Sequence, residues 1–304
     1  MEKAPPPLHM VNKIDRFTSI IVLRLIMAQK KYNSHSNPQS LKNEIQSDIS
    51  DILENMERWP AKKNAFIKSF VDLYELISNF HGKKILEIGC DRHLLSAQYF
   101  IIKGAEKVVV TSLIADKILK NPAKIDIFSG DVTKMDFAEK FDLIFGRAIL
   151  EHIADIRALS GIVNKYLRPN GVAYFDGGPM WYSVNGAHVW FMASSSTQYT
   201  FATNNPLKAY EHLIYTEDQL TNILEARIGH KGDAKEIVNY VYHSKDQNRL
   251  SNKEIVSAFQ KSGLVVDYKE EQSCPVPDSL LEYFEKAKLS QARLIVKIKK
   301  VNSC

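Results

Sequence analysis

The stretch KKILEIGCDRHLLS, residues 83–96, decides the fold, because a buried strand runs directly into a glycine and then into small and polar residues. A βα turn that binds a nucleotide begins in this way. However, Asp91 and His93 stand where such turns usually carry their later glycines. A pyrophosphate needs close approach of the backbone, so we do not expect a nicotinamide or flavin cofactor here.

From residue 83 onward, short apolar runs alternate with helical stretches. Such alternation is typical of βαβ units and predicts an α/β fold, with a Rossmann-like, mostly parallel sheet and helices on both faces. Helices are expected near residues 94–105, 152–169 and 252–263, and the last two strands lack an obvious crossover helix between them. The expected strands are residues 84–90, 107–112, 124–132, 141–149, 171–178, 264–271 and 292–300.

The chain is expected to have a helical N-terminal extension, residues 1–80, followed by the sheet domain, residues 81–304. In the extension, apolar residues recur at intervals of three and four, which is typical of amphipathic helices. It is expected either to form a lid over the cofactor site of the sheet domain or to form a homodimer interface. Its most apolar run, SIIVLRLIMA, contains an arginine and is shorter than the ~20 residues that span a bilayer, so no membrane span is expected.

Composition excludes some classes of protein. A net charge of +5 over 304 residues is mild and gives no clear sign of a nucleic-acid partner. The three cysteines, Cys90, Cys274 and Cys304, form no CxxC pair, which argues against a disulfide framework and a structural zinc site. We expect no metal and a reducing, cytoplasmic location.

A set of short motifs resembles the class I S-adenosylmethionine-dependent methyltransferases. The motifs are ILEIGC, the GD after the third strand, FDLIF, EHI and LRPNG, and they extend over roughly residues 80–176. The resemblance implies S-adenosyl-L-methionine as cofactor. It also implies a seven-stranded sheet in the order 3-2-1-4-5-7-6, in which the last strand is antiparallel.

The resemblance also implies a set of cofactor contacts. Glu87 would orient the amino end of the cofactor, Gly89 would admit its methionine part, and Asp131 would accept a hydrogen bond from the adenine amino group. The acid that usually holds the ribose is missing at the end of the second strand, where Thr111 and Ser112 stand. Asp116 is an alternative partner for the ribose. The full set is Glu87, Gly89, Cys90, Asp91, Thr111, Ser112, Asp131, Val132, Arg147 and Ala148.

An insertion at about residues 177–250 follows the fifth strand and is rich in aromatic residues and histidines. We expect it to form a lid that covers and binds the methyl acceptor, because aromatic and polar groups together are typical of small-molecule sites. The alternative is that its aromatic residues form a small core of their own. Expected acceptor contacts are Glu151, Trp181, Tyr182, Trp190 and Tyr215, and His152, His188 and His212 are candidate general bases.

The sequence therefore predicts methyl transfer to an oxygen or nitrogen of a small-molecule acceptor, such as a glycan or another metabolite. A catalytically inactive binding or scaffold protein is the alternative, suggested by Asp91, His93 and the missing ribose acid. An RNA or protein acceptor is a third reading, although the chain has no recognisable RNA-binding appendage.

Overall fold

The computed structural model describes residues 43, 47, 69–71, 73, 76, 77, 79–91, 94–113, 124–245, 247–272, 276–289 and 291–300. Almost all of the predicted extension, residues 1–80, lies outside the described residues, as do His93, Asp116, Cys274 and Cys304. A homodimer through the extension therefore stays a prediction. Among the described residues, no helix is both long and apolar enough to cross a membrane.

The chain divides into two compact units, of which the first ends at Ser129. Its strands are β1 (Lys84–Ile88), β2 (Lys107–Ser112) and β3 (Ile125–Ser129), with helix α4 (Leu95–Ile102) between β1 and β2. β1 pairs in parallel with β2, and β2 with β3. Phe70, Phe80, Tyr99 and Phe100 form a buried aromatic cluster that fixes α4.

The second unit, which begins at Gly130, carries the other strands of the main sheet. They are β4 (Phe141–Gly146), β5 (Leu167–Gly177), β8 (Val265–Gln272) and β9 (Gln291–Lys299). β4 and β5 are parallel, whereas β9 is antiparallel to both β5 and β8. The sheet has seven strands in the order β3-β2-β1-β4-β5-β9-β8, which confirms the predicted order and the antiparallel last strand.

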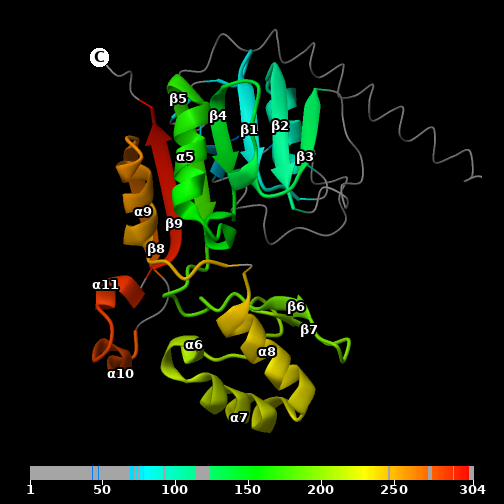
Figure 1. Ribbon diagram of the computed structural model, residues 1–304, viewed down its shortest axis with the longest axis vertical. Helices are drawn as coiled ribbons and strands as arrows, with labels where there is room; N and C mark the ends of the chain where they lie inside the picture. Colours follow the sequence, from blue (N-terminus) through cyan, green and yellow to red (C-terminus); the bar gives the residue numbers. More distant parts are fainter. Residues whose placement is uncertain are drawn as a thin grey trace, which may run out of the picture. The chain divides into compact units, whose positions relative to one another are not determined.

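Helices α5 (Ile156–Tyr166) and α9 (Asn252–Lys261) lie side by side on one face of this part of the sheet (Figure 1). The hydroxyl oxygens of Ser160 and Ser262 are 2.6 Å apart and join the two helices. Two 3-10 turns precede α5, namely η3 (Val132–Lys134) and η4 (Leu150–His152). The prediction that this helix runs to Pro169 is wrong, because the chain enters β5 at Leu167, where it pairs with Phe141.

Residues 178–250, called the insertion from here on, form a separate layer with its own core (Figure 1). It contains a two-stranded ribbon of β6 (Trp190–Met192) and β7 (Gln198–Thr200), and helices α6 (Glu211–Ile214), α7 (Glu217–Ile228) and α8 (Lys231–His243). Thr216 caps α7 in a capping box with Gln219. Two short helices, α10 (Asp278–Leu281) and α11 (Lys286–Leu289), lie between β8 and β9.

Candidate active site

The turn after β1 begins at Gly89, as predicted from the glycine that directly follows the strand. Gly89 has a φ of +73°, a backbone conformation that glycine adopts without strain, and its N–H donates to the Thr111 carbonyl at 2.8 Å. Glu87 is buried in β1 beside Val110 of β2. The first unit thus gathers its predicted cofactor residues at the carboxyl ends of β1 and β2, the edge at which open α/β sheets bind ligands.

The neighbours of Gly89 have mainly structural contacts. An oxygen of Asp91 accepts a hydrogen bond from the Leu95 N–H at 3.3 Å, so this carboxylate helps to begin α4. Burial raises the pKa of the Cys90 thiol to about 12, despite a hydrogen bond with Ser112, so Cys90 is no nucleophile at neutral pH. Thr111 and Ser112, at the end of β2, are both almost completely buried.

In the second unit, Asp131 begins the turn η3 and lies at its surface. Its Oδ1 accepts hydrogen bonds from both the N–H and the hydroxyl of Thr133, at 3.0 and 2.7 Å. Although partial burial opposes it, these bonds hold the pKa of Asp131 below its usual range. Lys134 is 3.7 Å from Oδ2. Asp131 therefore offers a charged oxygen at the surface, next to the buried Val132.

Arg147 and Ala148 follow β4, where the backbone is held by a contact that the sequence did not predict. Ala148 has a φ of +50°, and its N–H donates to Asp176 Oδ1 at 2.6 Å. The other oxygen of Asp176 accepts from Arg293 at 2.7 Å. Asp176 and Arg293 are thus positioning residues for this turn, and the only signal for Asp176 was an acid at the end of a strand.

Glu151 lies in η4 and is only 2% exposed. The chain leaves room for its carboxylate because Gly177 has no side chain: a Cβ there would come within 2.6 Å of Glu151 Oε2. Burial raises the pKa of Glu151 to about 8, although backbone N–H groups of Glu151 and Gly178 favour the charged form. Arg293 also favours the charge, but its guanidinium bonds to Asp176.

The structure brings Glu151, His152 and His188 together. The ring centroids of the two histidines are 4.9 Å apart, and one ligand atom of each of the three residues lies within 4.8 Å of the others. His188 comes from the insertion, has a φ of +44°, and packs edge-on against Phe201. Two of the predicted bases and one predicted acceptor contact therefore share one location.

Two further residues, missed by the sequence analysis, hold this location together. The side-chain amide of Asn248 donates to the carbonyl oxygens of Leu150 and Ile153. Its backbone N–H donates to the carbonyl oxygen of Glu151 at 2.8 Å. Gln247 donates to the Ala187 carbonyl at 2.7 Å. The end of the insertion thus ties η4 to the loop that carries His188.

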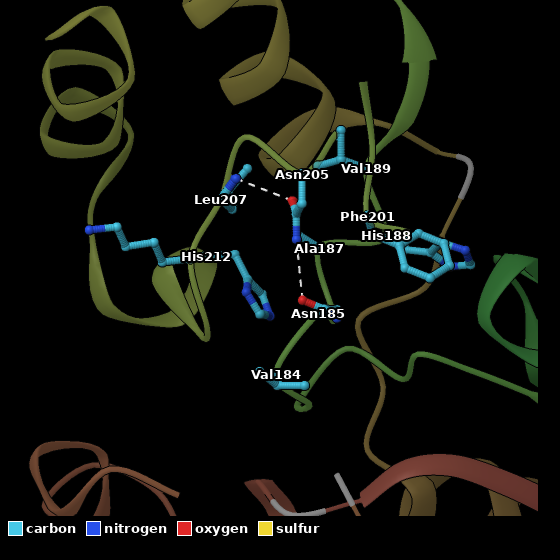
Figure 2. A pocket seen from close by; sticks show the side chains of 10 residues that line it. Val184, Asn185, Ala187, His188, Val189, Phe201, Asn205, Leu207 and His212 are labelled. Atoms are coloured by element: carbon cyan, nitrogen blue, oxygen red, sulfur yellow. Dashed lines mark hydrogen bonds between the residues drawn. The ribbon is translucent and has the colours of Figure 1, made fainter. Parts of the chain in front are cut away.

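A small pocket in the insertion has His188 on one side and His212 on the other, with Asn185 and Asn205 between them (Figure 2). Asn205 donates to the side chain of Asn185 at 3.2 Å. The cavity volume is about 10 Å³. A single water molecule needs roughly that much space, so this pocket has no room for a methyl acceptor in this conformation.

His212 is a weak base in this setting. Its Nε2 is 2.8 Å from the Trp181 carbonyl oxygen, which can only accept, so Nε2 carries the proton. Burial lowers the pKa of His212 to about 4, against the effect of this bond. A general base works best with a pKa near the working pH, so His212 is poorly suited to that role.

The predicted aromatic contacts do not gather at one place. Trp181 packs in the core of the insertion, against His212 and below the guanidinium of Arg249, as the alternative reading expected. Tyr182 lies under Lys288, and Tyr215 packs at the edge of the core. Trp190, by contrast, is 47% exposed on β6, where it can contact a ligand.

A comparison with protein families identifies the chain. Residues 61–227 match the model of a methyltransferase domain. The chain belongs to this methyltransferase family. The match confirms the predicted resemblance and, with it, S-adenosylmethionine as the cofactor that the family uses.

Similar proteins were found in two other comparisons. The ubiquinone biosynthesis O-methyltransferase of Rhodopseudomonas palustris (strain HaA2) is 28% identical over 116 residues, 36% of this chain and 46% of that protein. A histidine protein methyltransferase 1 homolog of Dictyostelium discoideum is 28% identical over 127 residues, 38% of this chain and 41% of that protein. The chain thus spans less than half the length of these curated relatives.

Among solved structures, an S-adenosylmethionine-dependent methyltransferase from Mesorhizobium loti is similar, with a TM-score of 0.47 and 16% identity. The similarity covers 75% of this chain and 96% of that one.

Proposed function

We propose that this protein transfers the methyl group of S-adenosylmethionine to an oxygen or nitrogen of a small-molecule acceptor. The observation that carries the proposal is the cluster of Glu151, His152 and His188, in a chain of the methyltransferase family. The insertion contributes His188, so the segment that follows β5 takes part in the location where the bases gather.

The chemistry requires little more than alignment and a proton acceptor. The acceptor atom attacks the methyl carbon while the carbon–sulfur bond breaks, and S-adenosylhomocysteine leaves as a neutral thioether. Correct positioning of two reactants supplies up to ~7–11 kcal/mol of the barrier. A hydroxyl acceptor must also lose its proton, and the imidazole of His152 or His188 accepts it.

The methionine end of the cofactor is assigned to the turn after β1. Gly89 turns the backbone through its positive φ, and the hydrogen bond from its N–H to the Thr111 carbonyl fixes this conformation. The carboxylate of Glu87 suits the cofactor's ammonium group. Asp131 and Val132 remain the predicted partners of the adenine. Thr111 and Ser112 remain the predicted partners of the ribose; like Glu87, they are almost completely buried.

Calorimetry of the full chain with S-adenosylmethionine and S-adenosylhomocysteine tests the cofactor half of the proposal. We expect Asp131→Asn to weaken binding roughly 10-fold, since a hydrogen bond to a charged group contributes about 1.5–3 kcal/mol. Asp126→Asn is the matched control, because Asp126, on strand β3, is also an exposed acid but pairs with Lys107 of β2. Absence of binding would favour the scaffold reading.

A screen with labelled methyl donor tests the acceptor half. Hydroxylated aromatics, sugars and small amines are compared with peptides and RNA, since one relative is named as a protein methyltransferase and another as a small-molecule O-methyltransferase. We expect label in a small molecule only. His188→Gln should lower kcat more than it changes the affinity for the cofactor. Label in peptides or RNA alone would overturn the proposed acceptor class.

A further inference from the structure

The cluster of Glu151, His152 and His188 has the composition of a metal site, although no spacing in the sequence predicts one. Two imidazoles and one carboxylate are a donor set used for zinc and for other divalent transition metals. Three protein ligands leave at least one coordination position open, as in catalytic rather than structural sites.

The ligand atoms of the three residues lie nearly as close together as those around a bound ion. Their ligand atoms lie within 4.8 Å of one another, and His152 Nε2 is 3.9 Å from Glu151 Oε1. A tetrahedral ion with bonds of ~2.0–2.2 Å holds its ligand atoms about 3.3 Å apart. The side chain of His152 is 38% exposed, so rotation of this ring can close the remaining gap.

The surroundings of Glu151 point to a cation as well. Within the part of the chain that the structure describes, neither carboxylate oxygen of Glu151 has a well-aligned hydrogen bond. A buried carboxylate without such bonds is costly unless a cation or metal compensates it. The guanidinium of Arg293 bonds to Asp176 instead, and the ligand atoms of the two histidines lie within 4.8 Å of the Glu151 carboxylate.

The backbone around the cluster is fixed before any ion binds. Asn248 holds η4 through the carbonyl oxygens of Leu150, Glu151 and Ile153, and Gln247 holds the loop of His188 through Ala187. Gly177 leaves the space that the Glu151 side chain fills. Metal sites depend on such support from outside the ligand set, because it fixes the directions of the ligands.

From this arrangement we propose that Glu151, His152 and His188 bind a divalent transition-metal ion of the zinc class. The use of the ion rests on the proposed function: the open coordination position takes the acceptor's oxygen. A hydroxyl bound to such an ion loses its proton more readily, because the metal stabilises the oxyanion. In that case His152 and His188 would act as ligands of the ion instead of accepting the proton, which would go to solvent, and the oxyanion would attack the methyl carbon.

The direct test is metal binding to the full chain, in the absence of cofactor and acceptor. Protein stripped with a chelator is titrated with Co²⁺, whose visible absorption reports coordination by nitrogen and oxygen, and Zn²⁺ is then added in competition. We expect one equivalent of Co²⁺ to give the absorption and Zn²⁺ to remove it. His152→Ala, His188→Ala and Glu151→Gln should each weaken binding by more than the ~10–100-fold seen for residues that only support ligands.

His243→Ala is the control, because His243 also pairs with a carboxylate, that of Glu217 at 2.9 Å, but on the exposed surface of α8. This variant should bind Co²⁺ like the natural protein. His152 is partly exposed, so its variant is expected to fold even where the Glu151 variant does not. No absorption, or equal binding by the His152 and His188 variants and the natural protein, would overturn the metal site.

The two proposals fail in different ways. Co²⁺ binding without methyl transfer to any acceptor would contradict the proposed function and leave the metal site intact. Methyl transfer that continues in chelator-treated protein without Co²⁺ binding would contradict the metal site alone.

Discussion

The sheet and the insertion of the second unit are stabilised in different ways. The strands β4, β5 and β9 are buried apolar runs, and their neighbours α5 and α9 cover them with further apolar side chains. The insertion also has an apolar core, but two buried carboxylates lie beside it: Glu211 pairs with Arg227, and Asp233 accepts hydrogen bonds from Ser195 and Tyr199. Apolar burial is non-directional, whereas a buried polar pair is stable only with its partner.

The difference has a consequence for function. The sheet provides a fixed frame, whereas in the insertion His212 is held by a hydrogen bond that depends on where its proton lies. We therefore expect damage to the sheet to unfold the protein as a whole. Damage to a polar pair in the insertion should loosen that layer while the sheet stays folded.

The largest effect is expected for Phe175→Ala in β5. Phe175 is fully buried and stacks on Phe259 of α9, with ring centroids 5.7 Å apart. Removal of the ring leaves a cavity and should lower the free energy of unfolding by about 4 kcal/mol. Urea denaturation measures the loss, and Phe128→Ala, at a half-exposed ring on β3, is the control. A similar loss in both variants would contradict the role given to the sheet core.

The sheet was largely predictable because each strand is a distinct apolar run. All seven expected strands are present, since alternating buried runs and helices admit few other folds. Their order came from the resemblance, because an apolar run does not say which strand it pairs with. The end of α5 was predicted too late because Pro169 was expected to stop the helix. Pro169 lies in β5 instead, where the register shift between Phe141 and Leu143 leaves it outside the paired residues.

The next largest effect concerns pH and the insertion. The pKa of His212 is about 4 in the folded chain, against about 6.5 for a free histidine, so the unfolded chain binds more protons between these values. Stability should therefore fall as the pH drops from about 6.5 to about 4, by about 3 kcal/mol in total. Urea denaturation across this range measures it.

The variant His212→Asn isolates this effect. Asparagine can still donate to the Trp181 carbonyl but does not titrate in this range, so the variant should lose that part of the pH dependence. His243→Asn, at an exposed histidine of α8, should keep it. A pH dependence unchanged by His212→Asn would mean that this histidine is not buried neutral.

A smaller and local effect is expected for Arg227→Met. The Arg227 guanidinium donates to both oxygens of Glu211 at 2.7 Å and, against the effect of burial, holds the pKa of Glu211 below its usual range. Removal leaves a buried carboxylate without its cation, which should destabilise the insertion by about 2 kcal/mol, since Arg227 is partly exposed.

Hydrogen exchange locates this loss. Amides of α7 and α8 should exchange faster, while those of β4 and β5 should keep their protection. Lys107→Met removes an exposed pair with Asp126 and should have no measurable effect. Faster exchange throughout the sheet would show that the two layers do not unfold separately.

The candidate site was less predictable than the sheet, because its parts are far apart in the sequence. The chain suggested His152 and His188 separately, but only the fold brings them together, and nothing marked Asn248 or Gln247 as the residues that join their loops. Helix α8 was missed although its buried residues, Ala234, Ile237, Val238 and Val241, recur at three- and four-residue intervals.

The smallest effect separates local from tertiary stabilisation within the insertion. The Thr216 hydroxyl accepts from the Gln219 N–H and so caps α7, whereas the Thr221 hydroxyl, on the same helix, donates to the Glu217 carbonyl. Thr216→Ala leaves the first N–H groups of the helix without this acceptor and should destabilise the insertion by about 1 kcal/mol. Thr221→Ala should be neutral or slightly stabilising, because alanine is the better helix former and that carbonyl is already used by the helix. Hydrogen exchange of α7 and α8 measures both variants. If Thr216→Ala loosens α7 but leaves α8 protected, the core that the two helices share, rather than their ends, holds the insertion together. If both helices loosen equally, the cap contributes to the stability of the whole layer.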